Sequence, residues 1–185
     1  IDVLIANAGM STRPGRLYKA KVEDFERIVQ INIIGVFYTF KAFVPDMVNE
    51  SSEPNAPMKK IIGISSGLAH STSPILGPYS TTKIAVEYMC KSMAQSFHME
   101  KKNNIICVPF APGVVHTEMM TDASRSIPAK EWSEAVVPFI LNWDRNINGS
   151  SQVAPNGYSR EYQSTWIIPA GLPITTKVIL PKATD

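Results

Sequence analysis

Apolar runs of strand length alternate with long helical stretches along this chain, and that alternation limits its fold more than any other feature. Strands are expected at residues 3–6, 61–65, 104–110 and 150–154. Helices are expected at residues 22–48, 79–98 and 132–141. Strands separated by helical stretches of about ten residues or more form βαβ units, which build a parallel sheet. We therefore predict an α/β fold, a doubly wound parallel sheet with helices on both faces.

Turn-forming and polar residues follow directly on three of the predicted strands. They are Asn7-Ala8-Gly9, Ser65-Ser66 and Pro112-Gly113. In open α/β sheets the ligand binds beyond the carboxyl ends of the strands. We therefore expect these three groups to line one crevice.

The composition excludes several classes of function. The 185 residues, 44% hydrophobic and 18% charged, suit one globular domain. The net charge of +2 comes from scattered basic residues, so nucleic acid is not an expected partner. No apolar run approaches the roughly 20 residues of a membrane span, so we expect no membrane association. Cys90 and Cys107 are two lone thiols, which favours a reducing, cytoplasmic compartment. His70, His98 and His116 are too dispersed to suggest a metal site.

A tyrosine and a lysine stand four residues apart where the second predicted helix begins. This spacing places Tyr79 and Lys83 on one face of a helix, one turn apart. A fixed ammonium beside a phenol favours the phenolate and lowers the pKa of the tyrosine from its usual value of about 10. Such a pair can act as a general acid and base. The simpler interpretation, an aromatic ring packed beside a solvated lysine, fits the same spacing.

Two further polar residues occupy informative positions. Ser66 lies thirteen residues before Tyr79 at the end of a strand, where its hydroxyl would point into the crevice. A fixed donor aimed at a carbonyl oxygen contributes about 2.7–4 kcal/mol to catalysis. Asn32 lies within an apolar helix, where an amide competes with backbone bonding. The alternatives are a serine that only ends a strand and an asparagine satisfied locally at a helix kink.

In order and spacing, Asn32, Ser66, Tyr79 and Lys83 match a catalytic tetrad. This tetrad is that of the short-chain dehydrogenase/reductase family, which residues 1 to about 153 resemble. The resemblance implies a Rossmann-like fold for residues 1–154. It also implies an enzyme that moves hydride between NAD or NADP and a carbonyl or alcohol.

The resemblance implies a role for each tetrad residue. Tyr79 would protonate the carbonyl oxygen in reduction, or remove the hydroxyl proton in oxidation. Lys83 would lower the pKa of Tyr79 and bind the nicotinamide ribose. Ser66 would bind the reacting oxygen, and Asn32 would hold a water that relays protons between Lys83 and solvent.

The same resemblance implies a cofactor site at the strand ends. Asn7, Ala8 and Gly9 are similar to the family's Asn-Ala-Gly turn, which would pass close to the cofactor ribose. Pro112 and Gly113, with Val115 and Thr117 after them, are similar to its Pro-Gly-x-x-x-Thr segment. There the backbone of Val115 and the hydroxyl of Thr117 would bind the nicotinamide carboxamide, and Tyr79 and Lys83 would complete the site.

Residues beside the tetrad are candidates for the substrate pocket. They are Ser66, Leu68, His70, Met119 and Met120, whose apolar members favour an apolar small molecule. The apolar faces of the two long helices exceed what one sheet face needs. Since such helices pair between subunits in this family, we expect a homodimer or homotetramer.

The chain also departs from the family pattern. It has no Gly-rich turn of the type Thr-Gly-x-x-x-Gly-x-Gly and none of the family's first strands. We therefore expect an incomplete chain in which the strand at residues 3–6 has an unpaired apolar edge. Pro109 suggests a strand edge or an early strand end. Residues 155–185 are expected to form an irregular extension.

Two other functions stay open. The tetrad could serve an isomerase, dehydratase or cyclase that performs no redox chemistry. A catalytically silent member could act as a binding or oligomerisation protein, although such a protein has no need of all four residues.

Overall fold

The protein forms a parallel sheet flanked by helices. The computed structural model describes residues 1–53, 55–120, 124 and 126–154. Its strands are β1 (Val3–Ala6), β2 (Lys59–Ile64), β3 (Ile105–Ala111) and β4 (Gln152–Val153). They pair in the order β1-β2-β3-β4, and every pair is parallel. The predicted parallel sheet is confirmed, and β4 is shorter than expected because only two of its residues pair.

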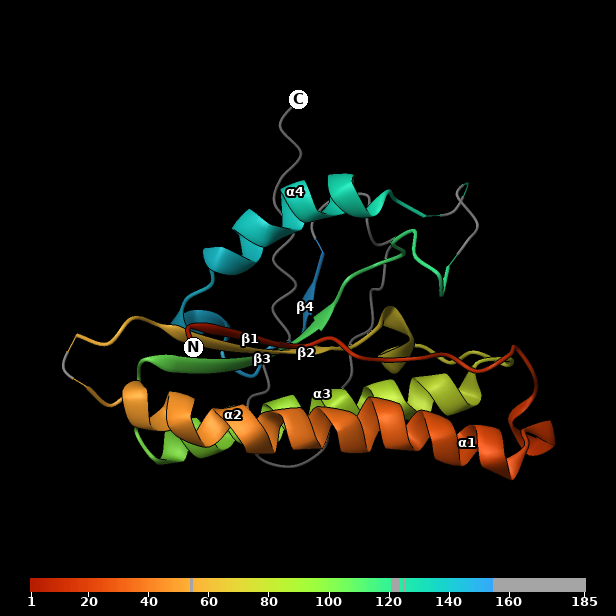
Figure 1. The fold of residues 1–185 in the computed structure, drawn as a ribbon, viewed down its shortest axis with the longest axis horizontal. Coiled ribbons are helices and arrows are strands. Elements are labelled where there is room, and N and C mark those ends of the chain that lie inside the picture. Colours follow the sequence, from red (N-terminus) through yellow and green to blue (C-terminus); the bar gives the residue numbers. More distant parts are fainter. Residues whose placement is uncertain (54, 121–123, 125, 155–185) are drawn as a thin grey trace.

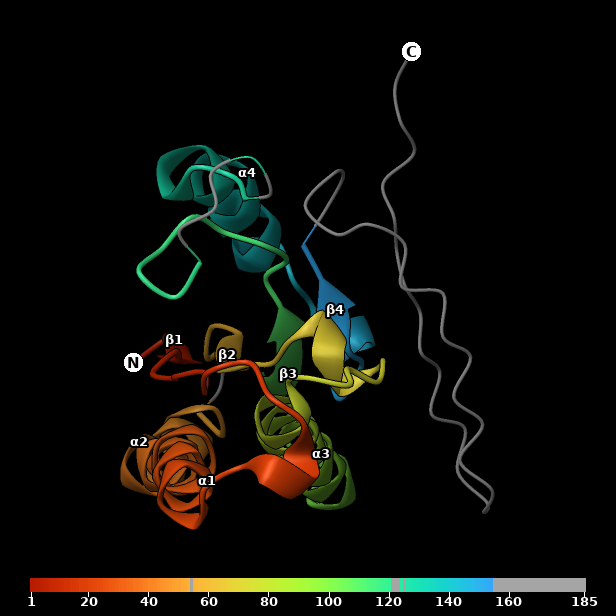
Figure 2. The same ribbon diagram turned by 90° about the vertical axis from the view of Figure 1, so that its right-hand side faces the viewer.

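Helices cover both faces of this sheet. They are α1 (Val22–Val29), α2 (Val36–Glu50), α3 (Gly77–Met99) and α4 (Ala129–Leu141). Figures 1 and 2 show α1, α2 and α3 on one face and α4 on the other. Short helical turns are η1 (Leu17–Lys19), η3 (Gly67–Ala69) and η4 (Arg145–Ile147). The doubly wound Rossmann-like arrangement is therefore confirmed.

The core consists of two apolar clusters, one on each face of the sheet. Side chains alternate in direction along a strand, so neighbours in β2 join different clusters. Ile61 packs with Phe40 of α2 and Val86 of α3. Ile62 packs on the other face with Ile140 of α4. Both isoleucines are fully buried, so this sheet holds the two helical layers together.

The predicted helix at residues 22–48 contains an irregular segment. Between α1 and α2 the backbone forms a π-helix, η2 (Gln30–Gly35), so the helical run extends continuously from Val22 to Glu50. A π-helical turn widens the helix and often marks a functional site. Asn32, fully buried, lies within this turn. A π-helical distortion therefore accompanies the asparagine, but its side chain is not satisfied locally, because its hydrogen-bond partners are Met10 and Thr82.

Of the two expectations for Pro109, the early strand end was wrong, whereas a position that is locally unpaired on one side fits. This proline lies inside β3, where it pairs with Gly63 of β2, and the strand continues beyond it to Ala111. The Phe110 carbonyl accepts a 2.8 Å hydrogen bond from Ser65 on the β2 side, whereas the Ala111 carbonyl accepts one of 3.0 Å from Ala154 on the β4 side. The backbone polar groups of Pro109 face the same side of β3 as those of Ala111, the side of β4. The strand β4 begins to pair only at Phe110, one residue after the proline. The missing N–H of Pro109 therefore breaks no bond with β2.

The helical run of residues 22–50 is more apolar than expected from the sequence, where no run was expected to approach the length of a membrane span. By length and composition alone its 29 residues could cross a membrane, since their most apolar stretch has a mean hydropathy of 1.4. In the fold, Ile28, Val36 and Phe40 of this run are buried. Phe37, half exposed, lies on the outer side. A helix that packs on a sheet accounts for the buried part of this apolar composition.

β1 is the first strand in the order of the sheet. It pairs with β2 on one side, and no other described strand pairs with it. Ile5 is 46% exposed. The expected apolar edge is therefore present in the described part of the chain. The predicted extension at residues 155–185 lies outside the described residues.

Candidate active site

The three groups predicted at the strand ends lie at one edge of the sheet. Asn7-Ala8-Gly9 follows β1, Ser65-Ser66 follows β2 and Pro112-Gly113 follows β3. Because these strands are parallel, their carboxyl ends share that edge. The start of α3 brings Tyr79 to the same edge, where it meets Ser66.

The side chains of Ser66 and Tyr79 are neighbours, close enough for Ser66 to affect the pKa of the Tyr79 phenol. Ser66 also caps the η3 turn, its Oγ accepting a 3.2 Å hydrogen bond from the Leu68 N–H. Burial raises the pKa of the Tyr79 phenol, and the Ser66 hydroxyl lowers it in part. The phenol is therefore protonated near neutral pH and has a hydroxyl as its neighbour.

The Lys83 side chain is buried below the same site. It is 4% exposed, and its Nζ donates a 2.8 Å hydrogen bond to the Ile64 carbonyl at the end of β2. Nζ lies 5.6 Å from the centroid of the Tyr79 ring. Burial lowers the pKa of Lys83 to about 8.

The predicted effect of Lys83 on the pKa of Tyr79 is not seen in this geometry. The causes acting on the phenol are burial and the Ser66 hydroxyl, and their net effect is a raised pKa. The physical reason is the direction of the lysine, since Nζ bonds a main-chain carbonyl and lies over the ring.

Asn32 connects the turn after β1 to α3. Its Oδ1 accepts a 2.8 Å hydrogen bond from the Met10 N–H, and its Nδ2 donates one of 2.9 Å to the Met10 carbonyl. The same Nδ2 also lies 2.9 Å from Thr82 Oγ1. The side chain of Asn32 therefore fixes the chain that follows Gly9 beside the helix that carries Tyr79 and Lys83.

Gly9 keeps open a small space between two of the tetrad side chains. A Cβ built on Gly9 would lie 3.4 Å from Asn32 Oδ1 and 3.4 Å from Lys83 Nζ. These two atoms therefore flank one point of the backbone after β1. The preceding Asn7 and Ala8 are exposed. Exposed backbone beside a buried ammonium suits a ligand that carries hydroxyl groups.

The segment after β3 turns sharply and then folds on itself. Gly113 has a φ of +78°, a conformation that glycine adopts easily. The Pro112 carbonyl accepts a 2.7 Å hydrogen bond from Trp132 Nε1 of α4. Thr117 exchanges main-chain hydrogen bonds of 3.1 and 3.0 Å with Met120, and Val115 pairs with Ile127 in an isolated bridge. Pro112 is therefore anchored to α4.

The residues predicted for the substrate pocket lie in two places. Leu68 and His70 belong to the turn that starts at Ser66, and the His70 Nε2 lies 3.0 Å from Glu87 Oε1. Met119 and Met120 are 49% and 38% exposed on the folded segment after β3. Their contact with a substrate stays a prediction.

Glu87 is a buried residue near the site that we did not predict from the sequence. It lies four residues after Lys83 on α3, and it is 4% exposed. A sequence signal was present, because an acidic residue at that spacing continues the Tyr79–Lys83 face of the helix. Its partners His70 and Ser151 are distant in sequence, so only the fold reveals them.

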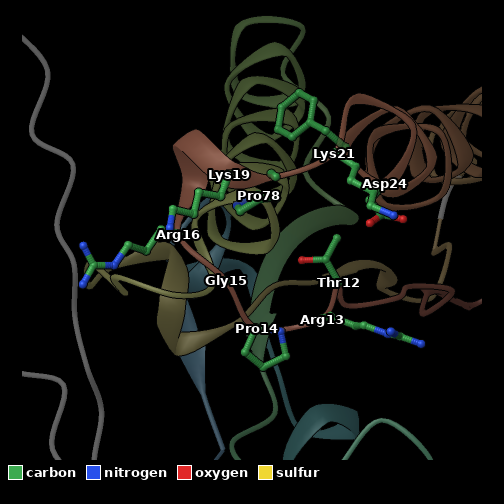
Figure 3. Close-up of a pocket in the computed structure, with 11 residues that line it drawn as sticks. Thr12, Arg13, Pro14, Gly15, Arg16, Lys19, Lys21, Asp24 and Pro78 are labelled. Atoms are coloured by element: carbon green, nitrogen blue, oxygen red, sulfur yellow. The ribbon is translucent and has the colours of Figure 1, made fainter.

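A surface cavity of about 220 Å³ lies beside the start of α3. Its wall includes Pro78, the neighbour of Tyr79, and the loop at residues 12–21. Four basic side chains and one acidic side chain line it. Figure 3 shows Arg13 and Arg16 pointing in opposite directions, away from the centre. Arg13 and Arg16 therefore do not converge on one point of this cavity.

Comparison with known proteins decides the family. The family model described as short chain dehydrogenase matches residues 1–127. The chain belongs to the short-chain dehydrogenase family. It is 27% identical over 157 residues to the NADPH-dependent pterin aldehyde reductase of Arabidopsis thaliana, covering 81% of this chain and 60% of that protein.

Two solved structures share the fold. A gluconate 5-dehydrogenase from Burkholderia cenocepacia, in complex with NADP and tartrate, superposes with a TM-score of 0.67 at 25% identity, covering 83% of this chain and 62% of that one. The carbonyl reductase Sniffer of D. melanogaster gives a TM-score of 0.74 at 23% identity, covering 83% and 64%. The chain thus spans about three fifths of the length of these short-chain dehydrogenase relatives.

Proposed function

We propose that the protein is an NAD(P)(H)-dependent oxidoreductase that interconverts a carbonyl and an alcohol, with Tyr79, Lys83, Ser66 and Asn32 as its tetrad. The observation that carries this proposal is the juxtaposition of Ser66 and Tyr79 beside a buried Lys83, whose Nζ lies 5.6 Å from the centroid of the Tyr79 ring. It brings a phenol, a hydroxyl and an ammonium from two elements to one edge of the sheet. Membership of the short-chain dehydrogenase family supports the reaction class.

The residues at the strand ends fit the nicotinamide half of such a cofactor. Gly9 has no side chain where a Cβ would approach Lys83 Nζ to 3.4 Å, so a ribose hydroxyl has room to reach the ammonium. Asn7 and Ala8 would flank that ribose. On the other side Pro112, Gly113 and the backbone of Val115, with the Thr117 hydroxyl, would bind the carboxamide. A relative named for NADPH and a structure with NADP make NADP the first cofactor to test, with NAD second.

In the proposed reaction the protein places and protonates the substrate. The bound nicotinamide supplies or accepts the hydride. In reduction Tyr79 donates the proton of its hydroxyl to the carbonyl oxygen, while the Ser66 hydroxyl donates a hydrogen bond to the same oxygen. The raised pKa of Tyr79 keeps that proton in place until it is needed. Lys83, with a pKa of about 8, can then return a proton to the site, and Asn32 would hold the water that relays it.

The proposed substrate is a small carbonyl or alcohol compound with an apolar part. Leu68 would contact it next to Ser66. Met119 and Met120 are partly exposed on the segment after β3 and would cover it. Flexible thioether side chains adapt well to apolar ligands.

We propose further that the protein is a homodimer or homotetramer joined through α2 and α3. Large apolar side chains are exposed on these helices at Phe37, Tyr38, Phe43, Ile84 and Tyr88. Exposed apolar patches of this kind mark protein–protein contacts. Analytical ultracentrifugation tests this point, since Ile84→Glu should lower the mass to that of a smaller species. A wild-type protein that sediments with the mass of a monomer would contradict the proposal.

A cytoplasmic, reducing location is also proposed. Cys90 and Cys107 are both buried and both free in the fold. Immunofluorescence of the protein in its native cells tests this, and a signal confined to another compartment would overturn it.

Turnover assays test the main proposal. The protein is incubated with NADPH or NADH and a panel of aldehydes, ketones and quinones, and the loss of reduced cofactor is followed together with alcohol formation. We expect stoichiometric formation of both products with at least one pair. Product formed without any nicotinamide cofactor would instead indicate the non-redox chemistry. No turnover on any pair, with the protein folded, would contradict an oxidoreductase.

A further inference from the structure

A buried acidic residue joins three parts of the fold next to the tetrad. The Glu87 side chain on α3 is 6% exposed. Its Oε1 lies 3.0 Å from His70 Nε2, in the segment after β2. Its Oε2 accepts a 2.5 Å hydrogen bond from Ser151 Oγ, just before β4, and lies 3.1 Å from Lys91 Nζ. A buried carboxylate with this many partners keeps one orientation.

Glu87 occupies the same face of α3 as the catalytic pair. Residues Tyr79, Lys83 and Glu87 are spaced by four, so they lie one above the other along the helix. Each of the three reaches toward the end of β2: Tyr79 to Ser66, Lys83 to the Ile64 carbonyl and Glu87 to His70. The helix is thus attached at three successive turns to one short segment.

That segment is itself a tight turn. The Ser66 Oγ accepts from the Leu68 N–H, the Ser66 carbonyl accepts a 2.9 Å hydrogen bond from Ala69, and the Gly67 carbonyl accepts one of 3.1 Å from His70. These bonds join Ser66 to His70 through a single 3₁₀ turn, η3. A displacement of His70 therefore moves the backbone that carries the Ser66 hydroxyl.

We propose that Glu87 is a positioning residue that acts through His70 to hold the Ser66 hydroxyl against the Tyr79 phenol. Glu87 touches neither substrate nor cofactor in this role. Ser151 and Lys91 contact the other carboxylate oxygen, Oε2, while the contact of Oε1 with His70 holds the η3 turn. The proposal rests on the proposed function for its catalytic consequence, while the contact itself can be measured without turnover.

Titration of Tyr79 tests the proposal directly. The protein is labelled with ¹³C at tyrosine Cζ, and the Tyr79 resonance is assigned as the one missing in Tyr79→Phe. In Ser66→Ala the pKa of Tyr79 should rise, because the Ser66 hydroxyl lowers it. His70→Ala and Glu87→Gln should raise it in the same direction.

A matched control separates positioning from stability. Ser151→Ala removes a different hydrogen bond of Glu87 on the β4 side, so it should lower the melting temperature and leave the Tyr79 titration unchanged. His70→Ala should also lower kcat by about tenfold or more, a part of the 10²–10³ that loss of a fixed donor costs. The KM for the cofactor should stay the same, because His70 lies in the turn after Ser66, on the proposed substrate side of the site.

Each outcome decides the point. A Tyr79 titration that is unchanged in His70→Ala but shifted in Ser66→Ala would overturn the proposal. His70 is only partly buried, so its alanine variant gives a result even where Glu87→Gln fails to fold. If the Tyr79 titration shifts as expected but turnover does not depend on Tyr79, the positioning contact is supported and only the proposed function is contradicted.

Discussion

The Lys83 ammonium donates a hydrogen bond of 2.8 Å to the main-chain carbonyl of Ile64, the last residue of β2. This bond holds a buried cation at the carboxyl end of a parallel strand. It lies there because α3 begins directly beside the strand end, so that its second turn passes over the carbonyl. The packing of α3 on β2 therefore brings Tyr79 and Lys83 to the strand end that carries Ser66.

Burial of Lys83 should make protein stability depend on alkaline pH. Its folded pKa of about 8 lies below the ordinary value of 10.5, so the unfolded chain binds the proton more tightly. Below pH 8 the charged form of Lys83 therefore lowers the free energy of unfolding by about 3 kcal/mol, at 1.36 kcal/mol per pKa unit. That cost should disappear as the pH rises from about 8 to 10.5. Urea unfolding at several pH values measures it.

Lys83→Met isolates this effect, because Tyr79 and Cys107 still titrate in the variant. Across that pH range the free energy of unfolding of the wild type should rise by about 3 kcal/mol relative to that of the variant. Lys130→Met, at an exposed position of α4, serves as the control. A difference that stays constant with pH would mean that Lys83 has an ordinary pKa.

Glu87 should have the opposite dependence, at acidic pH. Its folded pKa of about 2 lies below the ordinary 4.5; burial alone would raise it, and the interactions with His70, Lys91 and Ser151 outweigh that effect. Its stabilising contribution of about 3 kcal/mol is present above pH 4.5 and is lost as the pH falls toward 2. Glu87→Gln should therefore be less stable than the wild type at pH 7.

The two proteins should converge in stability as the pH approaches 2. Glu134→Gln, on the exposed surface of α4, should match the wild type at every pH. Equal stabilities of Glu87→Gln and wild type at pH 7 would show that the buried carboxylate gains nothing from its partners. Thermal unfolding monitored by circular dichroism at matched ionic strength distinguishes these results.

Gly63 should not tolerate a side chain. A Cβ at this position of β2 would lie 2.5 Å from Cys90 Sγ and 2.9 Å from Val86 Cγ1. Overpacking of this kind costs about 1–3 kcal/mol, so Gly63→Ala should lower the melting temperature. Adding Cys90→Ala removes the closer clash and should recover part of the loss. Gly15→Ala is the control, since its nearest neighbour lies at 4.0 Å, and a loss equal to that of Gly63→Ala would contradict the packing account.

Much of the fold could be predicted because hydrophobic periodicity reports burial directly. β1 was predicted at its observed bounds, and α3 began two residues earlier than expected. The π-helical segment around Asn32 was not predicted, because one extra residue in a turn barely changes an apolar pattern. An early strand end was wrongly expected at Pro109, because the sequence does not show that the neighbouring strand begins to pair only at the residue after it.

The site was less predictable than the fold. Ser66 and Tyr79 are thirteen residues apart in the sequence and neighbours in the fold, while their catalytic roles stay a prediction. The direction of Lys83 toward Ile64 could not be predicted, since a long side chain chooses among partners that only the tertiary structure supplies. The same holds for Glu87, whose bond to Ser151 joins residues 64 positions apart.

The most direct test of the proposed chemistry is turnover by Tyr79→Phe. The variant lacks only the hydroxyl that would exchange the proton, and Tyr88→Phe, on an exposed part of the same helix, is its matched control. We expect Tyr79→Phe to lose turnover by at least about 10²-fold while its melting temperature and cofactor affinity stay near those of the wild type. Tyr88→Phe should retain full activity. Equal turnover by Tyr79→Phe and wild type would contradict a Tyr79-based oxidoreductase.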